Sequence, residues 1–240
     1  MGSNGLPIPH NSTTIRGLGG KPSILVAPGT GGGCIVSGPF ANATVNLGPI
    51  GLDPQGPNNG LGYNLRCITR DINLNYSNQT KASDVLRLIT NCNRSLECFH
   101  NIMEDARGIH GGGHFTTGGL GLDAWASPGD PMFYLHHAAV DWVWSLWQGL
   151  DQRGRTGLVF GTQTAFNGEC DPSLRLLFLH FGRLKKIDML TMDFFGADAV
   201  PTSPNVTLDT ELDCFGVLAP PQRYGDLDST VDGPFCYAYV

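Results

Sequence analysis

Four histidines between residues 110 and 137 have the types and the spacing of metal ligands. His110 and His114 lie four residues apart, and His136 and His137 form a doublet further along the chain. Imidazoles at positions i and i+4 of a helix lie on one face, where the pair can hold one metal ion. Because adjacent helical residues point about 100° apart, only one histidine of the doublet is expected to complete the site. The pattern therefore predicts one metal ion held by three histidines.

A run of three glycines separates the first two histidines, in the stretch "GIHGGGHFTTGG". A glycine inside a helix costs roughly 1 kcal/mol relative to alanine. We interpret Gly111, Gly112 and Gly113 as residues that keep the surface beside the histidines bare. A substrate or a second metal ion is then able to approach the imidazoles closely.

Helices are expected to position these histidines, and apolar residues at helical spacing predict them at 83–91, 95–114 and 131–148. Ser95 is the expected N-cap of the second helix. Asp130 is the expected N-cap of the third, with Pro131 at the first helical position. The first 65 residues are rich in glycine and proline and are interpreted as turns that link short extended pieces.

The composition indicates one globular domain and disfavours two classes of partner. Of the 240 residues, 41% are hydrophobic and 15% are charged, and the net charge is −6. The acidic balance and the scattered basic residues argue against nucleic acid as a partner. No apolar stretch reaches the roughly 18 residues needed to cross a membrane, so no membrane partner is expected.

Two features predict passage through the secretory pathway. The first is a set of N-x-[ST] sequons, at Asn11, Asn42, Asn75, Asn78, Asn93 and Asn205. The second is a set of seven cysteines, most of which an exported protein would pair in disulfides. The N-terminus "MGSNGLPIPHNS" has neither the basic nor the apolar region of a signal peptide. We therefore expect the true start of the protein to lie upstream of Met1.

With its HxxxH pair and the segment "DPMFYLHHAAVDWVWSLWQ", the chain resembles the tyrosinase and catechol oxidase family, the type-3 copper proteins. The similarity is to the second copper-binding motif, CuB, of the short fungal members. It implies that His110, His114 and His137 bind copper, with His136 as a neighbour. The segments "GGGCIVSGPFANATVNLGP" and "NVTLDTELDCFGVLAPP" also resemble the fungal sequences, and Tyr237 and Tyr239 match their tyrosine motif. Trp142 departs from the arginine that many members carry there.

The resemblance implies a mainly α fold, part of the four-helix bundle of these proteins, with long Gly/Pro-rich loops and a few short strands. The chain would supply the CuB helix pair as a single domain over 1–240, truncated at its N-terminus. The missing helix pair would leave apolar faces exposed, so the chain is expected to aggregate. A stretch at 168–200 interrupts the similarity to the fungal sequences and is interpreted as a non-native insertion, translated intron, with a genuine family-specific loop as the alternative; the insertion would make Cys170 the odd cysteine.

A complete type-3 site holds two coppers with three histidines each, and the CuA triad is absent here. The remaining histidines are His10, His100 and His180, which are not expected to form a second copper site. The chain is therefore expected to bind at most one copper ion.

The function implied by the resemblance is oxidation of phenolic substrates, o-diphenols or o-aminophenols, to o-quinones by dioxygen. Gly111 stands where many relatives carry an asparagine that holds a water, which favours catechol oxidase or o-aminophenol oxidase over tyrosinase. Two alternatives are an inactive half-site and, less favoured, an oxygen carrier like the haemocyanins.

Further site residues are expected around the ligands. His136, Asp130 and Asp141 are candidates for orienting the imidazoles from outside, although Asp141 is equally well read as a surface or intrahelical carboxylate. Candidates for the substrate pocket are Gly111, Phe115 and Phe133.

Overall fold

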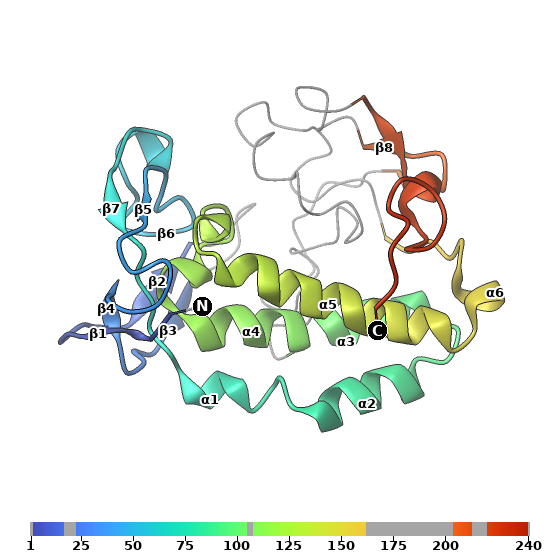
Figure 1. Cartoon of the computed structure of the whole chain (residues 1–240), viewed down its shortest axis with the longest axis horizontal. Helices are drawn as coiled ribbons and strands as arrows, with labels where there is room; N and C mark the ends of the chain where they lie inside the picture. Colours follow the sequence, from blue (N-terminus) through green and yellow to red (C-terminus); the bar gives the residue numbers. More distant parts are fainter. Residues whose placement is uncertain (1, 17–22, 105–107, 162–203, 213–219, 240) are drawn as a thin grey trace. The chain divides into compact units, whose positions relative to one another are not determined.

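The computed structural model describes residues 2–16, 23–104, 108–161, 204–212 and 220–239 (Figure 1). The chain forms two compact units. Unit 1 comprises residues 1–81 and 106–138, and unit 2 comprises residues 82–105 and 139–240. The insertion predicted at 168–200, with Cys170 and His180, lies outside the described residues, as does Cys214.

Short antiparallel strands make up much of the N-terminal part of unit 1 (Figure 1). The pairs are β1 (Gly5–Pro7) with β4 (Gly32–Ile35), β2 (Thr13–Ile15) with both β3 (Ile24–Val26) and β6 (Leu52–Asp53), and β5 (Thr44–Val45) with β7 (Arg66–Cys67). A disulfide between Cys34 and Cys67 joins β4 to β7. Ile35, the last residue of β4, packs with Ile68 and Leu120 in one buried cluster. The prediction of short extended pieces linked by turns is confirmed.

The helical elements of unit 1 carry the histidines. They are the 3-10 helices η1 (Asn58–Gly60), η2 (Gly119–Leu122) and η3 (Ser127–Gly129), the helices α1 (Leu74–Ser77) and α4 (Ile109–Thr117), and the first turns of α5 (Met132–Gly149). The prediction of one continuous helix at 95–114 was wrong. This stretch contains two helices, α3 (Leu96–Glu104) and α4, because Gly108 adopts an extended conformation (φ −83°, ψ −178°) and caps α4.

The start of α5 confirms the capping prediction. The backbone N–H of Met132 donates to Oδ1 of Asp130 at 2.9 Å, so the carboxylate satisfies a donor that the helix cannot pair. The helix runs to Gly149, which matches the predicted range to within one residue at each end.

Unit 2 contains the remaining helices and one small strand pair. They are α2 (Ala82–Asn91), α3, the rest of α5, α6 (Gln152–Arg155), β8 (Glu211–Leu212) with β9 (Gln222–Arg223), and the 3-10 helix η9 (Tyr224–Leu227). The helix predicted at 83–91 is α2. No described helix in either unit has the length and apolar character needed to span a membrane.

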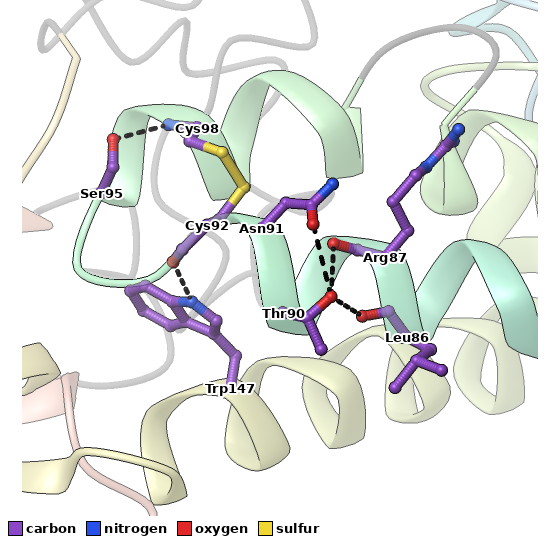
Figure 2. The surroundings of a disulfide bond; sticks show 8 residues. All are labelled: Leu86, Arg87, Thr90, Asn91, Cys92, Ser95, Cys98 and Trp147. Carbon is purple, nitrogen blue, oxygen red and sulfur yellow. Dashed lines mark hydrogen bonds between the residues drawn. A yellow bond between two sulfur atoms is a disulfide. The ribbon is translucent and has the colours of Figure 1, made fainter.

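A disulfide and two tryptophans order the interior of unit 2. Cys92 and Cys98 are bonded between the end of α2 and the start of α3, and the indole N–H of Trp147 donates to the Cys92 carbonyl at 2.6 Å (Figure 2). Phe99 packs against Trp144 and Trp147, with ring centroids 5.3 Å and 4.8 Å away. Figure 2 also shows Ser95, whose Oγ accepts from the Cys98 N–H at 3.1 Å, as its predicted N-cap role requires.

Candidate metal centre

Three imidazole nitrogens converge in unit 1. The Nε2 atoms of His110 and His137 each lie 3.2 Å from Nε2 of His114. Two imidazole nitrogens that bind one ion at the usual 2.0–2.1 Å, with a near-tetrahedral angle between them, are about 3.3 Å apart. The spacing of Nε2 of His114 from each of the other two nitrogens therefore fits pairs of ligands to a small metal ion.

The environment of His114 leaves one of its nitrogens available as a ligand. Its Nδ1 lies 2.9 Å from the carbonyl oxygen of Gly121, an acceptor, so Nδ1 carries the proton and Nε2 carries a lone pair. Burial, together with the neighbouring His136 and His110, holds the pKa of His114 well below its usual value. The imidazole is thus neutral, as metal coordination requires. Nothing in the sequence singled out Gly121.

His136 also lies close enough to compete for the third ligand position. One ring nitrogen from each of His110, His114 and His136 falls within 4.8 Å of the others. However, Nε2 of His136 is 2.8 Å from the carbonyl oxygen of His110, and the two rings stack with centroids 5.6 Å apart. Because that hydrogen bond places the proton of His136 on Nε2, its Nδ1 keeps a lone pair, and both His136 and His137 are candidates for the third ligand.

At two of the three glycines of this run, other side chains of the protein lie where a Cβ would stand. A Cβ on Gly113 would stand 2.1 Å from Cε1 of His136, and a Cβ on Gly112 would stand 3.0 Å from Cβ of Gln79. The interpretation that these glycines leave the surface bare for a substrate was therefore wrong at Gly112 and Gly113. Gly111 is buried.

The two phenylalanines predicted to line a substrate pocket have different surroundings. Phe133 is buried and stacks on His137 with centroids 4.0 Å apart and planes 28° apart. Phe115 is also buried, and its ring lies 5.0 Å from that of Tyr76 in α1. A small hollow beside the site is lined by His114, Thr117, Gly121, Ser127, Asp130, Met132, Phe133 and His136.

Asp130 takes part in a buried ion pair that the sequence did not reveal. Arg70 donates through Nε to Oδ2 at 2.8 Å and through Nη2 to Oδ1 at 2.7 Å. The side chains of Arg70 and Asp130 are 3% and 1% exposed. This two-pronged geometry is the strong form of an arginine–carboxylate contact. Asp130 thus contacts Arg70 and the first turn of α5, and it lies outside the ligand set.

Asp141 lies in unit 2 and accepts hydrogen bonds from the C-terminal tyrosines. The hydroxyls of Tyr237 and Tyr239 both donate to its Oδ2, the second at 2.7 Å. Burial and then the Asp141 carboxylate raise the pKa of the Tyr239 hydroxyl. These contacts reach Asp141 from the tyrosine motif, 96 and 98 residues further along the chain, so they are not the intrahelical hydrogen bonds of its alternative role.

The other described histidines have partners unrelated to the centre. Nε2 of His10 lies 2.9 Å from Oδ2 of Asp71 in unit 1. His100 is buried in unit 2 and packs against Trp144 and Phe160, with centroids 6.2 Å and 6.0 Å away. Within the described ranges, the histidine cluster of unit 1 is the one group of three or more potential ligands close enough to hold an ion.

The exposure of the sequon asparagines and the pairing of the cysteines are relevant to the predicted export of the protein. The asparagines of all six sequons are exposed: Asn11, Asn42, Asn75, Asn78, Asn93 and Asn205. Four cysteines form two disulfides, and Cys236 is the one cysteine of the described segments outside a disulfide.

Comparison with known proteins identifies the family of this chain. Residues 1–150 match the common central domain of tyrosinase. The oxidase hkm6 of Aspergillus hancockii is 34% identical over 229 residues, which cover 90% of this chain and 68% of that protein. The tyrosinase-like protein orsC of Emericella nidulans is also 34% identical, over 74% of this chain and 51% of its own length.

A solved structure shows the same relationship in three dimensions. A mutant polyphenol oxidase from Thermothelomyces thermophila superposes with a TM-score of 0.70 at 32% identity, covering 100% of this chain and 59% of the oxidase. The chain therefore spans between about half and two thirds of the length of these proteins. With its helices and short strands, its histidine cluster and these matches, the chain belongs to the tyrosinase family.

Proposed function

We propose that His110, His114 and His137 bind one copper ion, and that the chain takes part in oxidising o-diphenols or the related o-aminophenols by dioxygen. The observation that carries this proposal is the 3.2 Å distance from Nε2 of His114 to Nε2 of both His110 and His137, with the His114 tautomer set by the Gly121 carbonyl. Imidazole ligands suit copper, and membership of the tyrosinase family favours copper over zinc. Copper bound there supplies redox chemistry toward dioxygen.

The residues around the ligands hold the imidazoles and exclude water. The Gly121 carbonyl keeps the proton of His114 on Nδ1, away from the metal. Phe133 covers one face of His137, and His136 holds the backbone of His110 through its carbonyl. Such supports matter because outer contacts of metal ligands typically change metal affinity by 10–100-fold.

The names of relatives support a phenolic substrate. A relative in Emericella nidulans that is 31% identical is an N-acetyl-6-hydroxytryptophan oxidase, and its substrate carries a phenolic hydroxyl. Gly111, directly after the first ligand, has no side chain able to hold a water beside the metal. We therefore place diphenol or aminophenol oxidation ahead of monophenol hydroxylation for this chain.

An inactive half-site that binds at most one metal ion is the second candidate. The observation that favours it is the single cluster of potential ligands among the described residues. Copper content separates the two candidates. Two coppers per chain exclude the half-site, whereas one copper with no dioxygen uptake in the presence of catechol supports it.

The ligand assignment is tested with copper stoichiometry in four variants. His114→Ala and His137→Ala are expected to lose the bound copper, whereas His136→Ala retains it at lower affinity. His100→Ala, a buried histidine of unit 2, is the matched control and is expected to bind copper like the wild type. Loss of copper in His136→Ala together with full retention in His137→Ala would reverse the assignment of the third ligand.

We also propose that the protein is exported and carries N-linked glycans. The exposure of all six sequon asparagines and the two disulfides support this proposal. A mass decrease on treatment with an N-glycosidase, measured on protein from a eukaryotic secretion host, is the expected result.

A further inference from the structure

One extended segment of unit 1, Thr69–Asn73, is hydrogen-bonded to the end of α4. The Leu120 N–H donates to the Thr69 carbonyl at 3.1 Å, and the Asp71 N–H donates to the Thr117 carbonyl at 3.0 Å. The Asn73 N–H donates to the Thr116 carbonyl at 3.0 Å. The helix that carries His110 and His114 is thus anchored at its C-terminus by the backbone of this segment.

A side chain from the middle of the same segment anchors α5. Arg70 makes two hydrogen bonds to Asp130, at 2.8 Å and 2.7 Å, and a third from Nη1 to the Ser3 carbonyl at 3.3 Å. Oδ1 of Asp130, which accepts from Arg70, also accepts from the first backbone N–H of α5. The guanidinium is therefore linked to the start of the helix that carries His137 through a single carboxylate.

An N-cap alone does not require this arrangement. Asparagine and serine cap helices about as well as aspartate, and they bring no buried charge. A buried ion pair has a large desolvation cost, so it contributes little stability compared with an apolar pair of the same shape. The rigid fork of arginine does hold its carboxylate in one orientation, which a flexible lysine does not.

We propose that Arg70 is a positioning residue for the copper site, and this inference rests on the proposed function. By fixing Asp130 relative to segment Thr69–Asn73, Arg70 sets the separation between the ligand pair on α4 and His137 on α5. That separation determines whether Nε2 of His137 stays 3.2 Å from Nε2 of His114. Arg70 acts through Asp130 and does not touch the metal.

The test uses three variants and a matched control. Arg70→Lys keeps the charge and loses the fork. The double variant Arg70→Met with Asp130→Asn removes both buried charges and keeps an N-cap side chain. Arg70→Met alone leaves the Asp130 carboxylate buried without its partner and is the variant most at risk of misfolding. The control is Arg16→Met, which breaks the exposed ion pair with Asp53 in the same unit.

Three measurements are made on each variant: the Cu(II) dissociation constant, the electron paramagnetic resonance spectrum of the Cu(II) form, and the thermal midpoint without metal. Arg70→Lys and the double variant are expected to bind Cu(II) about tenfold or more weakly, with altered copper hyperfine splitting. The double variant is expected to keep most of the wild-type thermal midpoint. A purely structural role predicts instead that affinity recovers together with stability in the double variant.

The outcomes separate this inference from the proposed function. Wild-type affinity and an unchanged spectrum in either Arg70→Lys or the double variant overturn the positioning role, while the copper site stands. Failure of the wild-type chain to bind Cu(II), or binding that survives His114→Ala, overturns the copper site and the positioning role together.

Discussion

At the residue scale, the most consequential contact of the centre involves no second side chain. Nε2 of His114 carries a lone pair because Nδ1–H donates a hydrogen bond to the Gly121 carbonyl. A backbone acceptor cannot be removed by an ordinary substitution, so the tautomer of His114 is insensitive to mutation around it. Disturbance of this ligand must come through the path of the chain between Gly118 and Gly121.

Gly113→Ala is expected to destabilise unit 1 and displace His136. The added Cβ would meet the imidazole at 2.1 Å, and that ring is also held by the His110 carbonyl. Overpacking of this kind costs about 1–3 kcal/mol, more than the gain in helix propensity. Urea unfolding of the metal-free protein measures the change.

Gly149→Ala is the matched control, since it is also a glycine of a helix but has no atom within 4 Å of the added Cβ. It is expected to be neutral or stabilising by up to about 1 kcal/mol. Equal effects of the two substitutions on the free energy of unfolding would contradict this expectation, because they would mean that the His136 ring moves aside without destabilising unit 1.

The pair of His10 and Asp71 predicts a pH window of stability. Both ring nitrogens of His10 face acceptors, the Ile8 carbonyl at 2.8 Å and the Asp71 carboxylate at 2.9 Å, so the doubly protonated ring satisfies both. The Ile8 carbonyl and then Asp71 raise the pKa of His10 above 6.5. For Asp71, burial acts to raise the pKa, but the N–H groups of Gly29 and Gly31, together with His10, outweigh it and lower the pKa below 3.8.

The contribution of His10 is therefore complete below pH 6.5 and is lost as the pH rises through its raised pKa. The contribution of Asp71 is complete above pH 3.8 and is lost as the pH falls through its lowered pKa. Comparing the pH dependence of unfolding in wild type and His10→Gln checks this window. A constant difference in unfolding free energy from pH 5 to pH 9 would contradict it.

The proximity of His110 to His114 could be predicted from the sequence because helical spacing places both on one face. His110 and His114 share a face whatever lies around them, and Asp130 with Pro131 marks a helix start locally. Arg70 and Gly121 escaped prediction for different reasons. Arg70 meets Asp130 across 60 residues of sequence, and the Gly121 carbonyl is a backbone group without any signature in residue type.

At the element scale, the boundaries of the helices depended on single residues. Apolar periodicity continues from α3 into α4, so the pattern predicted one helix, whereas the extended backbone at Gly108 makes α4 begin anew. Helix α1 was not predicted because its four residues, Leu74–Ser77, are too few for a period to show. Asn73 is its N-cap, with a side chain that accepts from the Asn75 N–H, so capping chemistry was the available signal.

The two disulfides are expected to stabilise their units unequally. Cys34 and Cys67 are separated by 33 residues, whereas Cys92 and Cys98 are separated by 6. Loop-closure entropy assigns about 4 kcal/mol to the first bond and about 2 kcal/mol to the second. Paired Cys→Ala variants, compared by urea unfolding under non-reducing conditions, should show the larger loss for Cys34 and Cys67.

Cys236→Ala is the control for these variants, because this exposed cysteine forms no disulfide in the described structure. It is expected to leave the unfolding free energy within about 0.5 kcal/mol of the wild type. A larger loss in the Cys92 and Cys98 variant than in the Cys34 and Cys67 variant would show that local packing around Trp147, rather than chain entropy, determines the effect.

At the scale of the whole molecule, the distribution of apolar surface predicts self-association. Trp142, Leu146 and Leu150 follow one another at intervals of four residues, and they are 45%, 39% and 65% exposed. Trp142 and Leu146 lie on the part of α5 within unit 2, and Leu150 directly follows this helix. Contiguous apolar surface of this kind promotes association.

Leu146→Lys is expected to lower self-association by placing a charge in the middle of these three side chains. Light scattering at several protein concentrations measures the change. Gln152→Lys adds the same charge at an exposed position of α6 and is the control. Equal improvement in both variants would indicate a net-charge effect and contradict a role for the apolar side chains.

The placement of one disulfide in each unit has a consequence for how the protein must be made. Cys34–Cys67 lies in unit 1 and Cys92–Cys98 in unit 2, so a reducing cytosol would deprive both halves of their covalent cross-links at once. Recombinant chain from an ordinary bacterial cytosol would then differ from secreted material in fold stability before any metal is added. The choice of expression host is therefore itself an experimental variable, and an oxidising compartment is the one in which this chain can reach its described structure.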